Sequence, residues 1–382
     1  MLTEEKPVLP HARPPLRGRR LPARVAAAVL AAFALLLPAC SVPTEDSPGE
    51  VRVLTFSTYH SREHPNSRTF QDWMDSVTAR TGGKIRFEAF YDGSLCPADE
   101  TLSCVEDGRV DLAFDSPAFN PVLAVANVGS IAFQTPDFDA VTRAMNALLD
   151  EAPELGAEYR DRNQHVLFLG GGTPPVLALN DSVTVRSLDD LGGVSVRATG
   201  GMATGLRLLG MQPAAVEPSQ TYEAIERGVV SGIGYSLDSL TDGRLHEVAD
   251  QVFDISDMGV YAIVTYGINV DVWDSLDADV QEAMRAASDD AVAGSMTAHQ
   301  DQAVRESCTI LGEAGIEVVP LGRDDRGGQW AAEGTAVQRA QWEEATAGLL
   351  ADPRAFSQRY VDLVKEFAPE RPRGVAEACA EE

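Results

Sequence analysis

Hydrophobic and polar positions from residue 51 onward predict strands and helices in alternation. Val51–Phe56 alternates between apolar and polar residues, as a half-buried strand does. Apolar residues then recur at helical spacing within Phe70–Val77, and Gly82-Gly83 supplies the glycines that commonly end a helix. Lys84–Phe90 returns to the alternating pattern. These segments predict a first strand, helix and strand.

The same order of elements continues along the chain and is repeated in a second unit. Pro97–Glu106 has a helical pattern, and Val110–Phe114 has the pattern of a strand. Later, Val194–Arg197 predicts a strand, Met202–Leu209 a helix, and Val230–Tyr235 a further strand. Strands that alternate with helices indicate a parallel sheet with crossover helices. The sequence therefore predicts two α/β units.

One long helix is predicted after the second unit. Asp277–Gly312 is rich in alanine and carries acidic residues at its start, where they favour the helix dipole. A helix of this length can run along both α/β units.

The first 39 residues have the three zones of a secretory signal: a basic stretch, an apolar run over Val25–Leu37, and a small residue before Cys40. The apolar run has about 13 residues, fewer than the roughly 20 of a membrane-spanning helix. Leu37-Pro38-Ala39-Cys40 resembles a bacterial lipobox, which predicts cleavage of residues 1–39 and lipidation of Cys40. The alternative is an ordinary signal peptide cut nearby, with Cys40 incidental. Residues 40–50 have almost no apolar content and are predicted to be a flexible tether.

Charge excludes some partners of the mature chain. Residues 1–39 hold six basic and two acidic residues, so their removal takes the formal net charge from −27 to −31. A surface this acidic repels nucleic acid, and no second apolar span is present in the sequence. About 340 residues remain, enough for two domains with separate cores.

Four further cysteines would meet an oxidising compartment, where disulfides persist. Proximity along the chain suggests the pairs Cys96–Cys104 and Cys308–Cys379. If the chain from Pro97 to Val105 were helical, the first two Cα atoms would lie about 12 Å apart, beyond the reach of a disulfide. Either the backbone departs from a helix here, or the pairing is different.

His60, Glu63 and His64 match the H-x-x-E-H pattern of one class of zinc peptidases. That chemistry needs both histidines on one helix face, with the glutamate as the base. Pro65 follows at once, and proline disfavours helical conformation in the preceding residue while it suits the first position of a helix. The histidines are therefore predicted in a loop before the Phe70–Val77 helix. A zinc hydrolase built on these three residues is kept as an alternative.

Two stretches in the second unit carry a family resemblance. The segments "DLGGVSVRATGG" (190–201) and "PSQTYEAIERGVVSG" (218–232) resemble the extracytoplasmic solute-binding proteins of TRAP transporters, the DctP-like family. The similarity continues in "HEVAD" (246–250) and "INVDVWDSLDADVQEAM" (268–284), and backward through "TGGKIRFEAFYDGSL" and "CVEDGRVDLAF". It covers Val51 to about Gly315 in one order.

The resemblance implies a two-lobed α/β fold with crossing hinge strands and a long connecting helix, like that of periplasmic binding proteins. We expect lobe I from residues 51–173 and 262–300, and lobe II from residues 174–261 and 301–382. In the cleft, Arg197 would form a salt bridge with a ligand carboxylate, for which a guanidinium is a planar bidentate match. The alternative is a surface arginine.

Departures from the family pattern narrow the expected ligand. Arginines common in relatives fall here at Val176 and Ala118, and a family asparagine falls at Tyr235. These changes disfavour a doubly charged or heavily hydroxylated ligand. The remaining candidates would supply aromatic walls and one polar cleft residue, although each could instead belong to a lobe core: Tyr59, Phe119, Tyr235, Tyr261 and Asp115.

The function implied is that of a receptor that captures a small monocarboxylate and delivers it to a TRAP membrane permease. The same resemblance implies an ion gradient as the energy source. We expect a monomer held outside the cytoplasm by its lipid anchor, with no cofactor and no catalytic residue. The alternatives are the zinc hydrolase and a ligand sensor built on the same fold.

Overall fold

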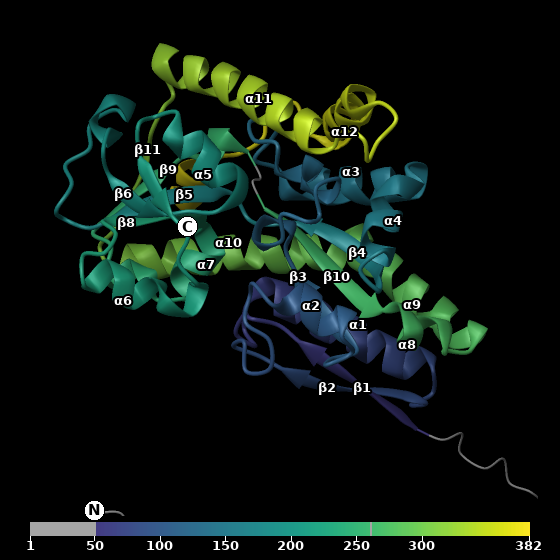
Figure 1. Ribbon diagram of the computed structural model, residues 1–382. Helices are drawn as coiled ribbons and strands as arrows, with labels where there is room; N and C mark the ends of the chain where they lie inside the picture. Colours follow the sequence, from purple (N-terminus) through teal and green to yellow (C-terminus); the bar gives the residue numbers. More distant parts are fainter. Residues whose placement is uncertain (1–50, 260–261) are drawn as a thin grey trace, which may run out of the picture. The chain divides into compact units, whose positions relative to one another are not determined.

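Two mixed β-sheets organise the protein, each with helices on both faces (Figure 1). The computed structural model describes residues 51–259 and 262–382, all within one unit that spans Pro48–Glu382. The predicted signal peptide, Cys40, the tether and Tyr261 lie outside the described residues. Within the described ranges, no helix has both the length and the apolarity needed to cross a membrane.

The first sheet has five strands, of which the three earliest along the chain are parallel. The parallel arrangement predicted for these three strands is therefore confirmed, and β10, which the sequence did not predict, adds an antiparallel strand between β3 and β4. The chain returns from the second sheet in the opposite direction, which the local pattern of each strand could not show. The strand order is β2 (Ile85–Phe90), β1 (Arg52–Ser57), β3 (Leu112–Asp115), β10 (Ile263–Asn269) and β4 (Gln164–Gly171).

Helices cover the first sheet on both faces, and we call the sheet with these helices the first lobe. Side chains on alternate strand positions pack to opposite sides, as the two-residue period of a strand requires. One face is covered by α1 (Pro65–Arg80), α8 (Val270–Asp274) and α9 (Ala278–Asp290). The other is covered chiefly by α3 (Phe138–Glu151), α4 (Pro153–Arg160) and α12 (Pro353–Phe367).

The second sheet and its helices form the second lobe. Its strand order is β11 (Val318–Pro320), β9 (Gln251–Asp254), β5 (Pro175–Leu179), β8 (Gly232–Ser236), β6 (Ser195–Arg197) and β7 (Gln212–Ala214). One face packs on α5 (Gly200–Arg207) and α11 (Asp325–Ala345). The other packs on α6 (Thr221–Glu226), α7 (Leu237–Asp242), α10 (Met296–Glu313) and α13 (Val375–Cys379).

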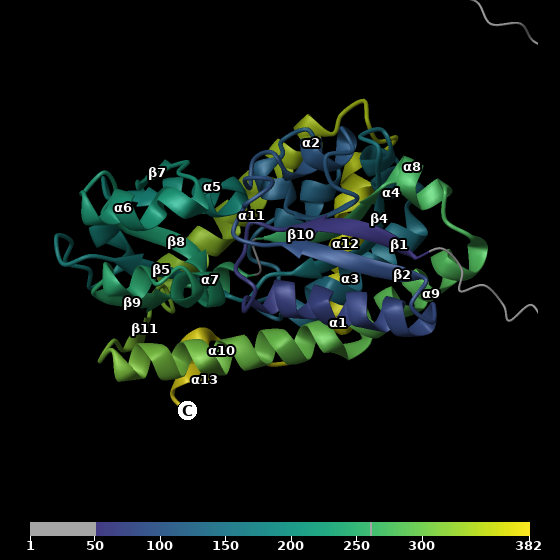
Figure 2. The same ribbon diagram turned by 90° about the horizontal axis from the view of Figure 1, so that it is seen from below.

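Two short connections lead from a strand of one sheet to a strand of the other, and the helices from α8 to α10 form a third, longer connection between β10 and β11. β4 of the first sheet continues through Gly172–Pro174 into β5 of the second, and β9 of the second sheet leads back to β10 of the first. α10 also runs along both lobes, and Figure 2 shows it beneath them. The predicted two-lobed fold with crossing strands and a connecting helix is therefore confirmed.

The connecting helix is broken where the sequence predicted continuity. α9 ends at Asp290, a π-helical turn covers Ala291–Ser295, and α10 begins at Met296. Gly294 has an extended φ of 179°, so the backbone leaves the helical path there. Of the two helices, α10 is the one that connects the lobes: it packs against α1 in the first lobe and against α7 and α13 in the second.

The C-terminal segment differs from the expected lobe assignment. Residues 301–382 were expected in the second lobe, yet Trp342, Tyr360 and Val364 are buried in the core of the first lobe. α11 starts on the second lobe, and the chain then crosses so that α12 packs on α3. The C-terminal residues are thus divided between the lobes.

Both disulfides that proximity suggested are present in the structure, Cys96–Cys104 and Cys308–Cys379. The first pair has a Cα–Cα separation of 6.4 Å because α2 (Thr101–Glu106) begins later than the expected Pro97. The turn before Thr101 brings the two cysteines together. The second pair links α10 to α13.

Candidate functional site

A small cavity of about 40 Å³ lies between the two lobes. Residues from the first lobe, the second lobe and both short connections line it: Tyr59, His60, Asn66, Ser116, Ala118, Phe119, Gly172, Thr199, Tyr235, Ser236, Asp238, Ser239, Ala262 and Val264. Space of this size admits little more than water. A ligand of several carbon atoms therefore requires the lobes to separate or the lining side chains to move. A larger hollow of about 510 Å³ lies between α3 and α9, away from the predicted residues.

Sheet topology explains why the predicted residues meet at this cavity. Arg197 and Tyr235 lie at the carboxyl ends of β6 and β8, which are neighbouring parallel strands. Tyr59 follows the carboxyl end of β1, and Phe119 follows that of β3, its parallel neighbour. Ligands of α/β sheets bind beyond the carboxyl ends of parallel strands, and here the ends from both lobes face one cavity.

Arg197 is 1% exposed, although it carries a charged guanidinium. Its Nε donates to the carbonyl oxygen of Val216 at 3.0 Å, whereas its buried Nη2 has no hydrogen-bond partner. No acidic side chain of the described residues forms an ion pair with it within 4.0 Å. Because a buried charge without a partner is costly, this donor is suited to a carboxylate brought by a ligand.

Aromatic rings hold the guanidinium in place. Its central carbon lies 4.6 Å from the ring centre of Tyr235 and 5.9 Å from that of Phe119. Tyr59 meets Phe119 edge to face, with ring centres 5.6 Å apart. All three rings line the cavity, so the structure places these predicted residues together with Arg197. Cation–π contacts of this kind fix a guanidinium without using its donors.

Asp115 lies elsewhere. Its side chain does not line the cavity and points to the opposite side of β3 from Phe114, which packs toward α1. One carboxylate oxygen accepts hydrogen bonds from Thr101 Oγ1 at 3.0 Å and Asn120 Nδ2 at 2.8 Å, while Oδ2 has no partner. Burial raises the pKa of Asp115 to about 6, and the hydrogen bonds oppose this shift. Its position indicates a structural role joining α2 to the loop after β3.

The structure locates the two positions at which relatives were expected to carry arginine. Val176 is fully buried in the second-lobe core, and Ala118 lines the cavity with a methyl group. The cavity lining contains no lysine or arginine among the described residues, and Arg197 borders it through Tyr235 and Phe119. The site therefore offers one guanidinium to a ligand.

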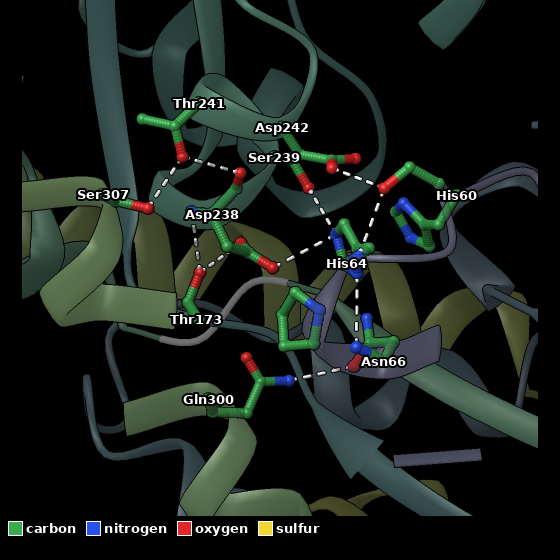
Figure 3. Close-up of polar contacts among 12 residues, drawn as sticks. His60, His64, Asn66, Thr173, Asp238, Ser239, Thr241, Asp242, Gln300 and Ser307 are labelled. Carbon is green, nitrogen blue, oxygen red and sulfur yellow. Dashed lines mark hydrogen bonds and ion pairs between the residues drawn. The ribbon is translucent and has the colours of Figure 1, made fainter. Parts of the chain in front are cut away.

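A polar cluster beside the cavity was not predicted as part of the site (Figure 3). His64 Nε2 lies 3.1 Å from Asp238 Oδ2 and 3.2 Å from Ser239 Oγ. Ser61 Oγ donates to Asp242 Oδ1 at 2.6 Å. The serine and histidine precede α1 in the first lobe, and their partners lie on α7 in the second. The histidine motif was the only sequence signal for this cluster, since α7 has no distinguishing pattern.

The histidines do not have the arrangement of a zinc peptidase. α1 begins at Pro65, and His64 caps it by accepting a hydrogen bond from the backbone N–H of Asn66, so the predicted loop position is confirmed. Glu63 is exposed, away from the buried His64. Because His60, Glu63 and His64 all precede α1, they do not lie on one helix face as that chemistry requires.

Ligand atoms of His60, His64 and Asp242 lie within 4.8 Å of one another, so their fit to a metal ion can be tested. The two imidazole rings are stacked, with centres 3.5 Å apart and planes inclined by 18°. A ring nitrogen binds metal in the plane of its ring, and one ion cannot lie in two stacked planes. His64 also uses both nitrogens in hydrogen bonds. The residues as placed do not fit a metal ion.

Comparison with known proteins identifies the family. The model for bacterial extracellular solute-binding protein family 7, DctP, matches residues 56–345. The chain belongs to this family. The resemblance seen in the sequence is thereby confirmed, and the protein is a solute-binding protein rather than an enzyme.

Two curated relatives show the extent of the sequence similarity. The C4-dicarboxylate-binding protein DctB of Bacillus subtilis is 24% identical over 56% of this chain and 61% of its own length. The C4-dicarboxylate-binding periplasmic protein DctP of Rhodobacter capsulatus is 23% identical over 84% of this chain and 91% of its own.

The solved structures share the two-lobed TRAP fold. A protein from Desulfovibrio salexigens, in an open complex, has a TM-score of 0.72 and 22% identity over 85% of this chain and 99% of its own. A protein from Rhodoferax ferrireducens with copurified benzoate has a TM-score of 0.72 and 19% identity, over 83% of this chain and 98% of its own. A protein from Bordetella bronchiseptica with bound mandelate has a TM-score of 0.74 and 20% identity, over 83% of this chain and 100% of its own.

Proposed function

We propose that this solute-binding protein captures a small monocarboxylate between its lobes and delivers it to a TRAP membrane permease. The observation that carries the proposal is the buried Nη2 of Arg197, which has no partner beside a cavity walled by aromatic rings. A ligand carboxylate satisfies that donor and neutralises the buried guanidinium.

Charge around the cavity favours one carboxylate over two. Asp238 is part of the lining, and its carboxylate would repel a second acid group of the ligand. Glu217, next to the Val216 carbonyl that Arg197 contacts, also lies near the guanidinium: burial and then Asp99 raise its pKa, while Arg197 lowers it. No lysine or arginine among the described lining residues could hold a second carboxylate. A dicarboxylate would therefore bring one charge into an acidic region.

The aromatic walls of the cavity favour a ligand whose apolar part is flat or branched. Tyr59, Phe119 and Tyr235 present ring surfaces to the cavity, and such surfaces bury apolar groups well. The Rhodoferax ferrireducens and Bordetella bronchiseptica proteins hold benzoate and mandelate. The Bacillus subtilis and Rhodobacter capsulatus relatives are described as C4-dicarboxylate-binding. Benzoate, mandelate and succinate are thus a discriminating set of probes.

The proposal includes delivery and location. We propose that residues 1–39 direct export, that lipid on Cys40 holds a monomer near the permease, and that an ion gradient drives transport. Tethering raises the effective concentration of the receptor at the membrane. Expression with the native leader tests the anchor: the mature N-terminal peptide should begin at lipid-modified Cys40, and Cys40→Ser should release the protein from membranes. An unmodified N-terminus at another residue would refute the anchor.

Ligand identification tests the function. Mass spectrometry of small molecules that copurify with the exported protein should find an organic acid with one carboxylate. In thermal melts, benzoate or mandelate should raise the melting temperature and succinate should not, because only ligands that bind the folded state stabilise it. Stabilisation by succinate alone would contradict the monocarboxylate assignment.

A further inference from the structure

The lobes are held together by hydrogen bonds between the start of α1 and the start of α7. His64 of the first lobe meets Asp238 and Ser239 of the second (Figure 3). Ser61 of the first lobe donates a hydrogen bond to Asp242 of the second. His64 is 2% exposed and Asp238 is 4% exposed. These contacts join the lobes in the arrangement described here, and a movement that separates the start of α1 from the start of α7 would break them.

The hydrogen bonds of His64 define its protonation state. Nδ1 accepts from the backbone N–H of Asn66 at 3.2 Å, so the ring proton lies on Nε2 and points to Asp238. A second proton would have to occupy Nδ1, directly against that N–H. His60 stacks on the same ring at 3.5 Å and is 9% exposed. The closed lobes therefore bury two neutral imidazoles in contact.

We propose that His60, His64, Asp238 and Asp242 form a proton-sensitive latch, in which proton uptake by the two histidines opens the lobes and releases the ligand. This inference rests on the proposed function, because it assumes that the ligand is held by closure. It adds that release is coupled to acidity at the membrane surface.

The pKa values of the two histidines support opening of the lobes, rather than closure, on proton uptake. Burial, followed by the charge of Arg68, lowers the pKa of His64 from 6.5 to about 3. Burial and then His64 lower the pKa of His60 well below 6.5, and Asp238 opposes that shift. In separated lobes the exposed rings return toward about 6.5. The open state then binds more protons, so the latch stabilises closure at pH values above about 6.5 and weakens as the pH falls below it.

The charged groups around His60 and His64 affect the pH dependence of lobe closure in different directions. Asp242 has a raised pKa, chiefly from burial, so its proton uptake favours closure and opposes the histidines. Arg68, which repels a proton on His64, is paired with Glu306 of α10. Glu63 is exposed. Acid groups titrate mostly below the histidine range, so the histidines dominate near neutral pH.

The test is calorimetry with benzoate or mandelate, whichever binds more tightly at about pH 8, repeated at about pH 5.5, where both acids remain ionised. Each imidazole should weaken binding about tenfold between these values, and two should weaken it up to about a hundredfold. In His64→Gln the ratio of the two dissociation constants should fall markedly, and in a His60→Gln/His64→Gln double variant it should approach one.

Two matched variants separate the latch from general effects of acid. His299→Gln alters a histidine on α10 that bonds Asp72 in the first lobe, and it should keep the wild-type ratio. Asp242→Asn should steepen the loss of affinity on acidification. Equal affinity at both pH values, or an unchanged ratio in the double variant, overturns the latch. Absence of binding by either acid at about pH 8 in all proteins instead refutes the proposed function, and the latch with it.

Discussion

The guanidinium of Arg197 stacks on the ring of Tyr235, 4.6 Å from its centre, and leaves one buried Nη atom without a partner. The two residues lie at the carboxyl ends of adjacent parallel strands, so the sheet itself fixes their spacing. Stacking orients the charge while the free donor stays available. The pair thus prepares the site for a carboxylate before the ligand arrives.

Removal of the Tyr235 ring should weaken ligand binding. Tyr235→Leu deletes a cation–π contact of about 0.5–2 kcal/mol and lets the guanidinium move, so the dissociation constant for benzoate should rise about 2- to 30-fold. Tyr235→Phe keeps the ring and loses only the hydroxyl contact with Ser239. Calorimetry on both variants checks this, and an equal loss in both would show that the ring face is not the important part.

Asp115→Asn should change stability but not affinity. The raised pKa of about 6 means that the folded state keeps a proton that the unfolded chain loses near about 4. Wild-type stability from this residue is therefore present at low pH and declines as the pH rises from about 4 to about 6. In urea unfolding, the free energy of unfolding of the variant relative to that of the wild type should increase by about 2–3 kcal/mol between about pH 4 and about pH 7.5. A large loss of benzoate affinity would instead place Asp115 in the binding site.

The two disulfides should contribute unequally to stability. Cys308–Cys379 closes a loop with a sequence separation of 71, whereas Cys96–Cys104 has a separation of 8. Loop entropy predicts a loss of about 4.4 kcal/mol when the Cys308–Cys379 pair is replaced by serines and about 2.5 kcal/mol when the Cys96–Cys104 pair is replaced. Urea unfolding of the two double-serine variants measures both. If removal of the Cys96–Cys104 disulfide destabilised the protein more than removal of Cys308–Cys379, packing around the short loop would outweigh loop entropy.

The strands and helices that the sequence predicted are those with a strong local period. Phe70–Val77 lies within α1, and the strands at 51–56 and 84–90 match β1 and β2 closely. The antiparallel β10, the break at Gly294 and the packing of α12 on the first lobe depend on contacts between distant residues. A local period contains no information about such contacts.

Several residues that were predicted from the sequence to bind the ligand lie together in the structure. Arg197 and the aromatic wall residues Tyr59, Phe119 and Tyr235 meet in the structure. Asp115 does not line the cavity, because a strand residue can face either side of its sheet and the sequence does not determine which side borders the cavity. Asp238 was missed because its partner His64 lies in the other lobe, far away along the chain.

The central claim is that Arg197 binds the ligand carboxylate. Its most direct test is the affinity of Arg197→Ala for the acid that binds the wild type most tightly, with Arg207→Ala on the exposed end of α5 as the matched control. Loss of one partner of a buried, hydrogen-bonded charge pair costs about 2–5 kcal/mol, so the dissociation constant should rise at least about thirtyfold. Arg207→Ala should bind as the wild type does. Wild-type affinity in a folded Arg197→Ala protein would contradict the account.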